Sequence, residues 1–207
     1  MKMYLSSYRL GDHPEQLAAL VGFNKKVAVI ANSRDFSTDF ERRKAGVQRE
    51  ISDLTALGFQ PEELDLRHYF GKPQKLYAKL SEYGMLWFIG GNTFILRKAF
   101  KASGLDDWLI RQKDNPEFVY AGYSAGVCVL SPSLKGLETV DDPGATAEGY
   151  SGEVIWEGLA LIDFAFAPHY RSDHPESPAV EKEVEYYKRH GIRFRALRDG
   201  EVIIINE

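Results

Sequence analysis

The sequence predicts an α/β protein built on a doubly wound, mostly parallel sheet with helices on both faces. Short apolar runs typical of buried parallel strands alternate along the chain with segments of helical periodicity. Such alternation favours a parallel sheet, because each crossover helix packs back onto one of its faces. One apolar run leads into Gly122-Tyr-Ser-Ala-Gly126, a Gly-x-Ser-x-Gly pattern placed between a strand and a helix.

Length and composition indicate an ordinary globular domain. With 207 residues the chain has the size of one domain with a full core, so we expect residues 1–207 to form a single unit. Hydrophobic residues make up 44% and charged residues 27% of the chain. The net charge is −4 and basic residues are spread along the sequence, which gives no electrostatic argument for nucleic acid as a partner.

The cellular location is predicted from cysteine usage and from the absence of long apolar runs. Cys128 is the one cysteine, which excludes an internal disulfide and favours a reducing compartment. No signal-peptide core follows Met1, and no apolar run is long enough to span a membrane. We therefore expect a cytoplasmic protein that does not bind membranes.

The first part of the chain predicts strands and helices in alternation. Lys-Val-Ala-Val-Ile-Ala at 26–31 and Met-Leu-Trp-Phe-Ile at 85–89 are strong patterns for buried strands, and weaker ones occur at 3–7 and 64–66. Periodicity and end signals, such as Gly58 after the second helix, predict helices. Their ranges are 15–20, 38–57, 74–82, 94–102 and 105–113.

Beyond the Gly-x-Ser-x-Gly stretch the pattern changes. Residues 132–153 show little periodicity, and a loop of this length in a compact domain is usually functional or mobile. A strand is expected over 161–167 and a helix over 179–190. The runs 194–197 and 202–205 flank Asp-Gly, which predicts a β-hairpin.

Ser124 is the candidate nucleophile. In a strand–turn–helix elbow the serine hydroxyl projects at the carboxyl end of the sheet, beside helix N-terminal amides such as that of Ala125. Gly90-Gly91-Asn92 ends the preceding strand, and its backbone can also approach a ligand and offer an amide to an oxyanion. The alternative is that both stretches are glycine-rich turns that serve packing alone.

Among the 5 histidines, His169 is the candidate base. It follows a buried strand directly, and so emerges at the edge where parallel sheets bind ligands. His174 lies in a polar loop, and His190 ends a helix. No histidine or cysteine pair has metal-ligand spacing on a helix, so neither a metal nor another cofactor is expected.

The acid that would orient His169 is left open by the residues alone. Candidates for this role lie in the irregular segment or after it: Glu138, Asp141, Asp142, Asp173, Asp199 and Glu201.

Three motifs together resemble the peptidase E family of serine peptidases, which includes the α-aspartyl dipeptidases and, more distantly, the cyanophycinases. They are Phe-Ile-Gly-Gly-Asn-Thr-Phe at 88–94, Ala-Gly-Tyr-Ser-Ala-Gly at 121–126 and Ala-Pro-His-Tyr at 167–170. The resemblance implies a fold like that of class I glutamine amidotransferases. It also implies Ser124 as nucleophile, His169 as base, and oxyanion amides from Gly90, Gly91 and Ala125.

The turn at 197–200 resembles the family's C-terminal acid–glycine turn, so Asp199 is predicted to orient His169, with Glu138 or Asp142 as alternatives. Two positions differ from the aspartyl dipeptidases. This chain has Ile89 where they have a first glycine, and Tyr123 where they have tryptophan. Tyr123 and Asn92 are predicted to line the substrate site.

Arg171, two residues after His169, is a candidate for binding a substrate carboxylate. We therefore expect a serine peptidase that cleaves short peptides, dipeptidase-like and with an acidic N-terminal residue as one candidate specificity. The alternatives are an esterase or other acyl hydrolase, or a catalytically silent protein that binds a small ligand. A small peptide is the expected partner, and a homodimer is left open.

Overall fold

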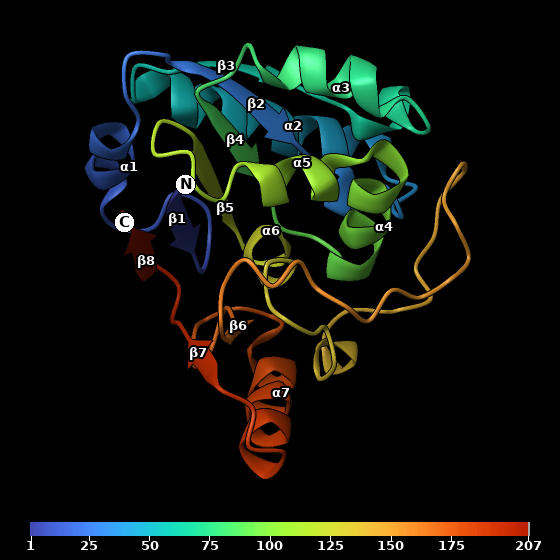
Figure 1. The fold of residues 1–207 in the computed structure, drawn as a ribbon. Helices are drawn as coiled ribbons and strands as arrows, with labels where there is room; N and C mark the ends of the chain where they lie inside the picture. Colours follow the sequence, from blue (N-terminus) through green and yellow to red (C-terminus); the bar gives the residue numbers. More distant parts are fainter. Residues whose placement is uncertain (207) are drawn as a thin grey trace.

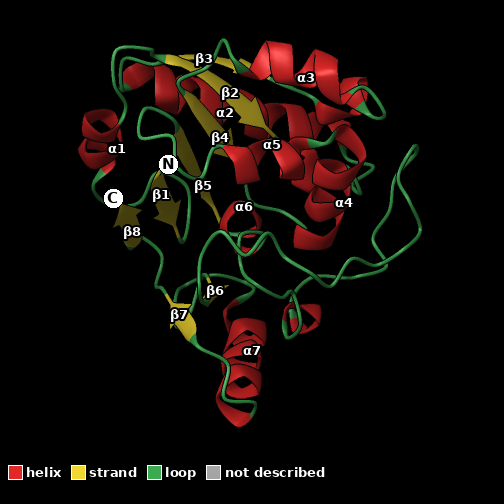
Figure 2. Ribbon diagram, in the orientation of Figure 1, coloured by secondary structure: helices red, strands yellow, loops and turns green. Residues whose placement is uncertain are grey.

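The centre of the structure is a six-stranded sheet in the order β3-β2-β4-β5-β1-β8 (Figures 1 and 2). The structure is a computed structural model that describes residues 1–206. The strands from β3 to β1 in this order are parallel, and β8 adds to β1 in the antiparallel direction. Their bounds are Lys2–Ser6 (β1), Lys26–Ile30 (β2), Gln60–Glu63 (β3), Met85–Phe88 (β4), Val119–Tyr123 (β5) and Val202–Ile205 (β8).

Helices cover both faces of this sheet, which confirms the predicted doubly wound fold (Figure 2). Alternate side chains of β2 point to opposite faces of the sheet. Val27 and Val29 pack with α1 and α2, whereas Ala28 and Ile30 pack in the cluster that includes α3, α4, α5 and α6. The bounds are Pro14–Leu20 (α1), Phe40–Ala56 (α2), Pro73–Leu80 (α3), Thr93–Ser103 (α4), Leu105–Arg111 (α5) and Ala125–Cys128 (α6).

A smaller unit lies beyond the carboxyl ends of the central strands, at the bottom of Figure 1. It consists of β6 (Ala165–Ala167) paired in parallel with β7 (Phe194–Ala196), and of α7 (Ser177–Arg189). Val180, Val184 and Tyr187 of α7 form a separate hydrophobic cluster with these strands. The unit matters for function because the loops at its edge face the end of the main sheet.

The expected hairpin over 194–205 is wrong. A turn is present, since Glu201 N donates to Arg198 O at 3.0 Å, but the strands on its two sides join different sheets. β7 pairs with β6 and β8 pairs with β1. The turn sequence fixes a local reversal of the chain, whereas the pairing partners are set by long-range packing.

The expected strand at 64–66 is also displaced. The strand is β3, over the polar residues Gln60–Glu63, while Leu66–Tyr69 form a 3₁₀ turn. β3 lies at the edge of the sheet, where little of its surface is buried and no apolar pattern is needed. The other short 3₁₀ turns are Asn32–Arg34 and Leu137–Thr139.

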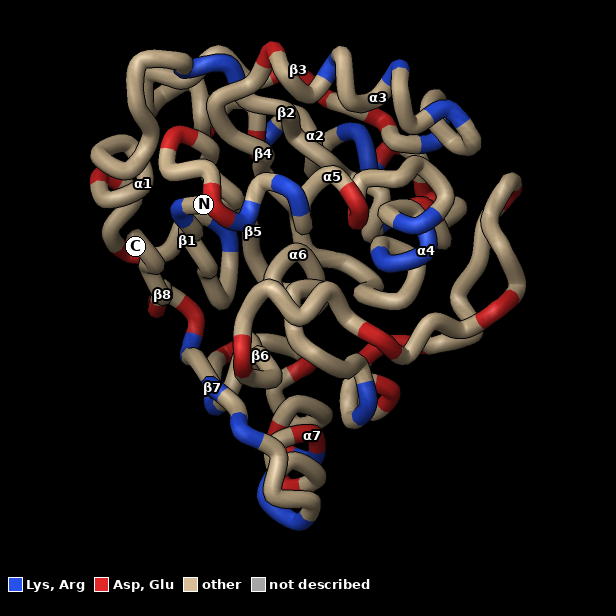
Figure 3. The backbone as a smooth tube through the Cα atoms, viewed as in Figure 1, with Lys and Arg blue, Asp and Glu red and all other residues tan. Residues whose placement is uncertain are grey.

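Figure 3 shows basic and acidic residues interspersed over the whole chain trace. Across residues 1–206, none of the helices combines the length and the apolar character needed to cross a bilayer.

Candidate active site

Ser124 stands at a strained junction between β5 and α6. Its φ and ψ angles are 51° and −121°, a backbone conformation that residues with a Cβ seldom adopt. The carbonyl of Ser124 accepts from Val127 N and Cys128 N at 2.7 and 2.9 Å, so the helix starts immediately after it. The serine therefore sits on a nucleophile elbow, with its side chain at the carboxyl end of the sheet.

The two glycines of the elbow are required by the strand next to it. A Cβ atom on Gly122 would lie 2.5 Å from Phe88 O, and one on Gly126 would lie 2.6 Å from the same oxygen. Only residues without a side chain let β5 and α6 approach β4 this closely. The pattern around the serine thus reflects packing of the backbone as well as presentation of the hydroxyl.

The Gly90-Gly91 turn lies directly against Ser124. A Cβ atom on Gly90 would lie 3.1 Å from Ser124 Cβ. The turn is fixed from behind, since Gly90 O accepts from Arg34 Nε at 2.9 Å and from Ser33 Oγ at 3.1 Å. Gly91 has a φ of 155°, and a Cβ atom there would meet Ser33 O at 2.6 Å.

Three backbone amides near Ser124 lack an acceptor. Within residues 1–206, the hydrogen bonds include none donated by the amides of Gly90, Gly91 or Ala125. Ala125 N is the first amide of α6, where no intrahelical acceptor exists. These amides can therefore donate to an oxygen bound next to Ser124, as an oxyanion site requires.

His169 is buried and paired with Asp199. His169 Nδ1 lies 2.6 Å from Asp199 Oδ1, and the histidine residue is 2% exposed. Ser7 Oγ accepts from His169 N at 2.8 Å and contacts Asp199 Oδ1 at 3.0 Å as a donor. Asp199 N in turn donates to Ser172 Oγ at 2.8 Å. Two serines thus hold the pair in place.

The environment favours the neutral form of His169. Burial lowers the pKa of His169 below its ordinary value of 6.5, although the hydrogen bond and the charge of Asp199 act in the opposite direction. The neighbouring His174 lowers this pKa further. Because Asp199 accepts from Nδ1, the Nε2 atom of the neutral ring carries the free lone pair that a general base needs.

The end of β1 brings the elbow and the histidine together. Ser124 N donates to Ser6 O at 3.4 Å, and His169 N donates to the adjacent Ser7 Oγ at 2.8 Å. No hydrogen bond joins Ser124 to the His169 ring in the described part of the chain. Catalytic hydrogen bonds are often long in unliganded enzymes and tighten when substrate binds.

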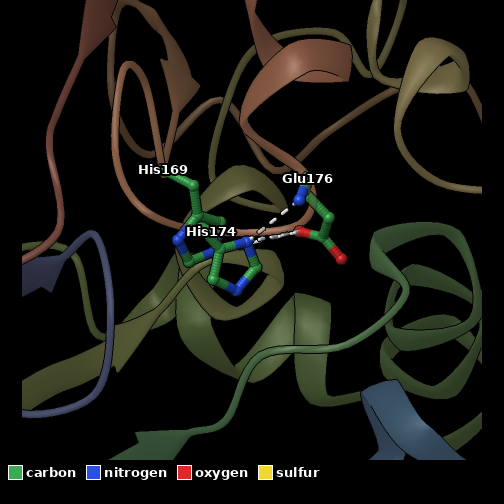
Figure 4. A group of neighbouring side chains, drawn as sticks. All are labelled: His169, His174 and Glu176. Carbon is green, nitrogen blue, oxygen red and sulfur yellow. Dashed lines mark hydrogen bonds and ion pairs between the residues drawn. The ribbon is translucent and has the colours of Figure 1, made fainter.

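A second histidine lies against the first. The His174 ring stacks on the His169 ring with centroids 3.7 Å apart and planes 8° from parallel (Figure 4). Tyr8 contacts both rings edge-on, with centroid distances of 5.7 and 5.6 Å. Glu176 Oε2 lies 3.9 Å from His169 Nε2, and burial raises the pKa of Glu176. His169, His174 and Glu176 supply atoms within 4.8 Å of one another that could hold a metal ion.

Sequence reasoning missed several of these neighbours. Ser7 and Tyr8 follow the first strand at the carboxyl edge of the sheet, so the rule that drew attention to His169 could have found them. His174 was expected only in a polar loop, and its stacking depends on how that loop folds back. The sequence carries no local signal for such a contact.

Asn92 has a mainly structural position. Its Oδ1 accepts from Ile95 N at 3.0 Å and so caps α4, while its Nδ2 donates to Asp142 O at 2.8 Å. Thr93 N donates to Asp141 Oδ2 at 2.8 Å, and burial raises the pKa of Asp141 to about 7. These bonds fasten the 132–153 segment beside the glycine turn.

Tyr123 lies beneath the elbow. It is 2% exposed, and its hydroxyl donates to Glu50 Oε1 at 3.1 Å and accepts from Arg34 Nη2 at 3.2 Å. Trp87 Nε1 donates to the other oxygen of Glu50 at 3.1 Å. The structure thus gives Tyr123 a supporting position under Ser124.

Arg171 and Glu138 both point to solvent. The Arg171 side chain is 69% exposed, 4.0 Å from Glu181, and its guanidinium lies over the Tyr170 ring. Glu138 Oε2 accepts from Gly136 N at 2.6 Å. Of the candidate acids in residues 1–206, Asp199 is the one that contacts His169 Nδ1. Asp142 uses Oδ1 to accept from Gly144 N at 2.8 Å.

Comparison with known proteins gives one family. The model of Peptidase family S51 matches residues 36–207. An uncharacterized peptidase of Listeria monocytogenes is 30% identical over 65% of this chain and 62% of its own length. A Drosophila melanogaster protein assigned as an alpha-aspartyl dipeptidase is 32% identical over 68% of this chain and 57% of its own. Peptidase E of Streptomyces coelicolor is 29% identical, over 66% and 54% respectively.

The aligned regions thus span less than two thirds of the length of these curated relatives. A solved structure of a protein assigned as a peptidase E from Listeria monocytogenes shares the fold. It superposes with a TM-score of 0.73 at 24% identity, covering 99% of this chain and 93% of that one.

Proposed function

The chain belongs to peptidase family S51, and from this premise and the site geometry we propose that it is a serine peptidase that cleaves short peptides. The observation that carries the proposal is the His169–Asp199 contact of 2.6 Å at the sheet edge where Ser124 occupies a strained elbow. A buried histidine held by a carboxylate, together with an elbow serine and backbone amides that lack acceptors, is the set of groups that acyl transfer requires.

The chemistry follows from the atoms in place. Ser124 Oγ attacks the carbonyl carbon of the scissile bond, while His169 Nε2 takes the serine proton. The carbonyl oxygen becomes an oxyanion, which the amides of Gly91 and Ala125 stabilise. When the C–N bond breaks, the imidazolium gives its proton to the leaving amine. Water, deprotonated by the same imidazole, then releases the acyl group from Ser124.

Asp199 acts through the histidine. Its carboxylate accepts from Nδ1, which fixes the tautomer and stabilises the imidazolium that forms during the reaction. The turn that carries Asp199 is anchored, because Ser172 accepts from its amide and Ser7 donates to its carboxylate. Substrate binding must still close the Ser124–His169 contact.

The 132–153 segment supports a preference for short substrates. It is fastened to the start of α4 through Asn92, Thr93 and Lys98, whose Nζ donates to Ala145 O at 2.9 Å. A further bond, from Tyr150 OH to Asp35 Oδ2 at 2.5 Å, ties the segment to the part of the chain that follows β2. A chain segment held in this way limits the space for residues beyond the scissile bond.

A substrate panel tests the proposal. Dipeptides with acidic or neutral first residues, their N-acetylated forms and simple esters are incubated with the wild-type protein and with Ser124→Ala. We expect amino acids to be released from dipeptides by the wild-type protein alone. Hydrolysis confined to esters would make the protein an acyl hydrolase of another kind. Ligand binding without turnover of any substrate would make it a silent binder.

The same panel addresses the acidic N-terminal residue. We propose Arg171 as a candidate partner for that carboxylate, since its guanidinium is exposed close to His169 in the chain. Arg171→Met should raise KM for acidic dipeptides and leave neutral ones unchanged. An equal effect on both classes removes Arg171 from recognition without affecting the peptidase proposal.

A further inference from the structure

Three side chains that could bind a cation lie together beside the Nε2 atom of His169, the proposed base. His169 lies in the turn after β6, His174 in the loop that follows, and Glu176 at the N-terminal cap of α7 (Figure 4). Glu176 Oε2 is 3.9 Å from His169 Nε2 and 3.9 Å from His174 Nδ1. The loop is short, so the three side chains come from one compact stretch of chain.

Glu176 has no basic partner. In the part of the chain that the structure describes, its carboxylate lies within 4.0 Å of the two histidines and of no lysine or arginine. It also accepts no hydrogen bond there. A carboxylate that faces two imidazole nitrogens without a counter-ion is poised to take a cation.

The donor set matches zinc. Two imidazole nitrogens and one carboxylate oxygen occur in protein zinc sites, with bond lengths of about 2.0 to 2.2 Å. In a tetrahedral site such bonds place neighbouring donor atoms about 3.4 Å apart. The two separations of 3.9 Å therefore need to close by about half an ångström. The His174 ring must also turn out of its stack on His169, because an imidazole binds a metal ion in the plane of its ring and the two planes lie 8° from parallel. The Glu176 and His174 side chains, 45% and 20% exposed, make these movements, whereas His169 stays held by Asp199.

The surroundings of the histidines favour ligation. Asp199 holds His169 Nδ1, which leaves Nε2 for a metal, and carboxylate–histidine–metal chains of this kind are common in metalloproteins. His174 Nδ1 accepts one long hydrogen bond, 3.3 Å from Glu176 N, so turning the ring toward the ion gives up a weak hydrogen bond. A metal bond there replaces that weak contact.

We propose that His169, His174 and Glu176 form a zinc site that occupies the Nε2 atom of the base and reversibly inhibits the protein. The inhibition rests on the proposed function, because it assumes that His169 accepts the proton of Ser124. The site itself rests only on the geometry. Water would complete the coordination on the exposed side, and substrate hydrolysis would resume when a chelator removes the ion.

Calorimetric titration of the EDTA-treated full-length protein with zinc chloride tests the site. We expect one ion per chain, and binding at least tenfold weaker in His174→Gln and in Glu176→Gln. His190→Gln is the matched control: this exposed histidine caps the far end of α7, about 20 Å away at 1.5 Å per helical residue. It should bind zinc as the wild type does. Circular dichroism confirms that each variant is folded.

A second measurement tests the inhibition. Dipeptide hydrolysis is followed against zinc concentration, each variant relative to its own rate in EDTA. Zinc should suppress the wild type and His190→Gln at concentrations that leave Glu176→Gln and His174→Gln at least tenfold less sensitive.

Wild-type zinc binding that is absent, or equal in folded Glu176→Gln and His174→Gln, would overturn the site. If no peptidase activity is found but calorimetry gives the expected pattern, the zinc site stands and the proposed function fails. Binding with unchanged hydrolysis would overturn the inhibition alone.

Discussion

The Nδ1 atom of His169 lies 2.6 Å from the Oδ1 atom of Asp199, although the two residues are thirty positions apart in the chain. The contact is supported from both sides. Ser7 at the end of β1 bonds to the backbone of His169 and to the carboxylate of Asp199, and Ser172 bonds to the amide of Asp199. A catalytic role for this pair is therefore open to direct tests.

Asp199→Asn should lower kcat by roughly 10² or more, because loss of the acid in well-studied triads costs about 10⁴. Asparagine keeps the shape of the side chain and the chemistry of the turn, but removes the charge that orients and stabilises the imidazolium. Steady-state kinetics on a dipeptide measures the effect. Glu138→Gln is the control, since its carboxylate accepts from Gly136 N and does not contact His169. If Glu138→Gln lost most of its activity while Asp199→Asn kept nearly all of it, Glu138 rather than Asp199 would be the acid that orients His169.

The pH profile should report the environment of His169. The base must be neutral, so kcat/KM rises with pH through the titration of His169 in the free enzyme. Burial lowers the pKa of His169, so the midpoint should fall below 6.5. In Asp199→Asn the negative charge that raises this pKa is gone, so the midpoint of the residual activity should move to still lower pH. A wild-type midpoint above 6.5 contradicts this account of the site.

Ser7→Ala should lower kcat by up to about thirtyfold, since each of its two hydrogen bonds to the pair contributes about 1 kcal/mol. The change removes an acceptor for His169 N and a donor to Asp199, so the pair should become less well placed. KM should change little, because Ser7 acts through the pair rather than on the substrate. Ser81→Ala, at the exposed end of α3, is the control. If both variants behave alike, Ser7 does not position the pair.

The central sheet could be predicted because its strands carry their own signal. Lys26–Ile30 and Met85–Phe88 are buried on both faces and read as apolar runs, and the elbow at Ser124 has a fixed local pattern. The hairpin prediction failed because Asp199-Gly200 encodes a turn, while the partners of β7 and β8 are decided by distant strands.

The predictions for the site divide in the same way, between residues with a local sequence signal and residues placed by long-range contacts. Ser124 and His169 follow strands, so the rule of the carboxyl edge predicted where they would lie. The stacking of His174 on His169 and the approach of Glu176 depend on the path of a polar loop, for which no periodicity exists. The side chain of Tyr123, the residue before Ser124, is buried beneath the elbow, where its hydroxyl donates to Glu50.

Gly126→Ala should destabilise the fold by about 1 to 3 kcal/mol. The added methyl group would lie 2.6 Å from Phe88 O and 2.7 Å from Phe88 Cβ, and the backbone oxygen cannot move without disturbing β4. Urea unfolding measures the loss. Gly152→Ala is the control, because apart from its chain neighbours no residue comes within 4 Å of its added Cβ. Equal midpoints for the two variants would contradict the close packing of α6 on β4.

Labelling with a fluorophosphonate probe tests the nucleophile most directly. The probe reacts with serines that a neighbouring base activates, and peptide mass spectrometry identifies the modified residue. The wild-type protein should take up one equivalent of probe, on Ser124, and lose its activity in proportion. Folded Ser124→Ala should take up none and should lose hydrolysis by a factor on the order of 10⁶. Labelling at another residue, or a folded Ser124→Ala protein with near wild-type turnover, would show that Ser124 is not the nucleophile.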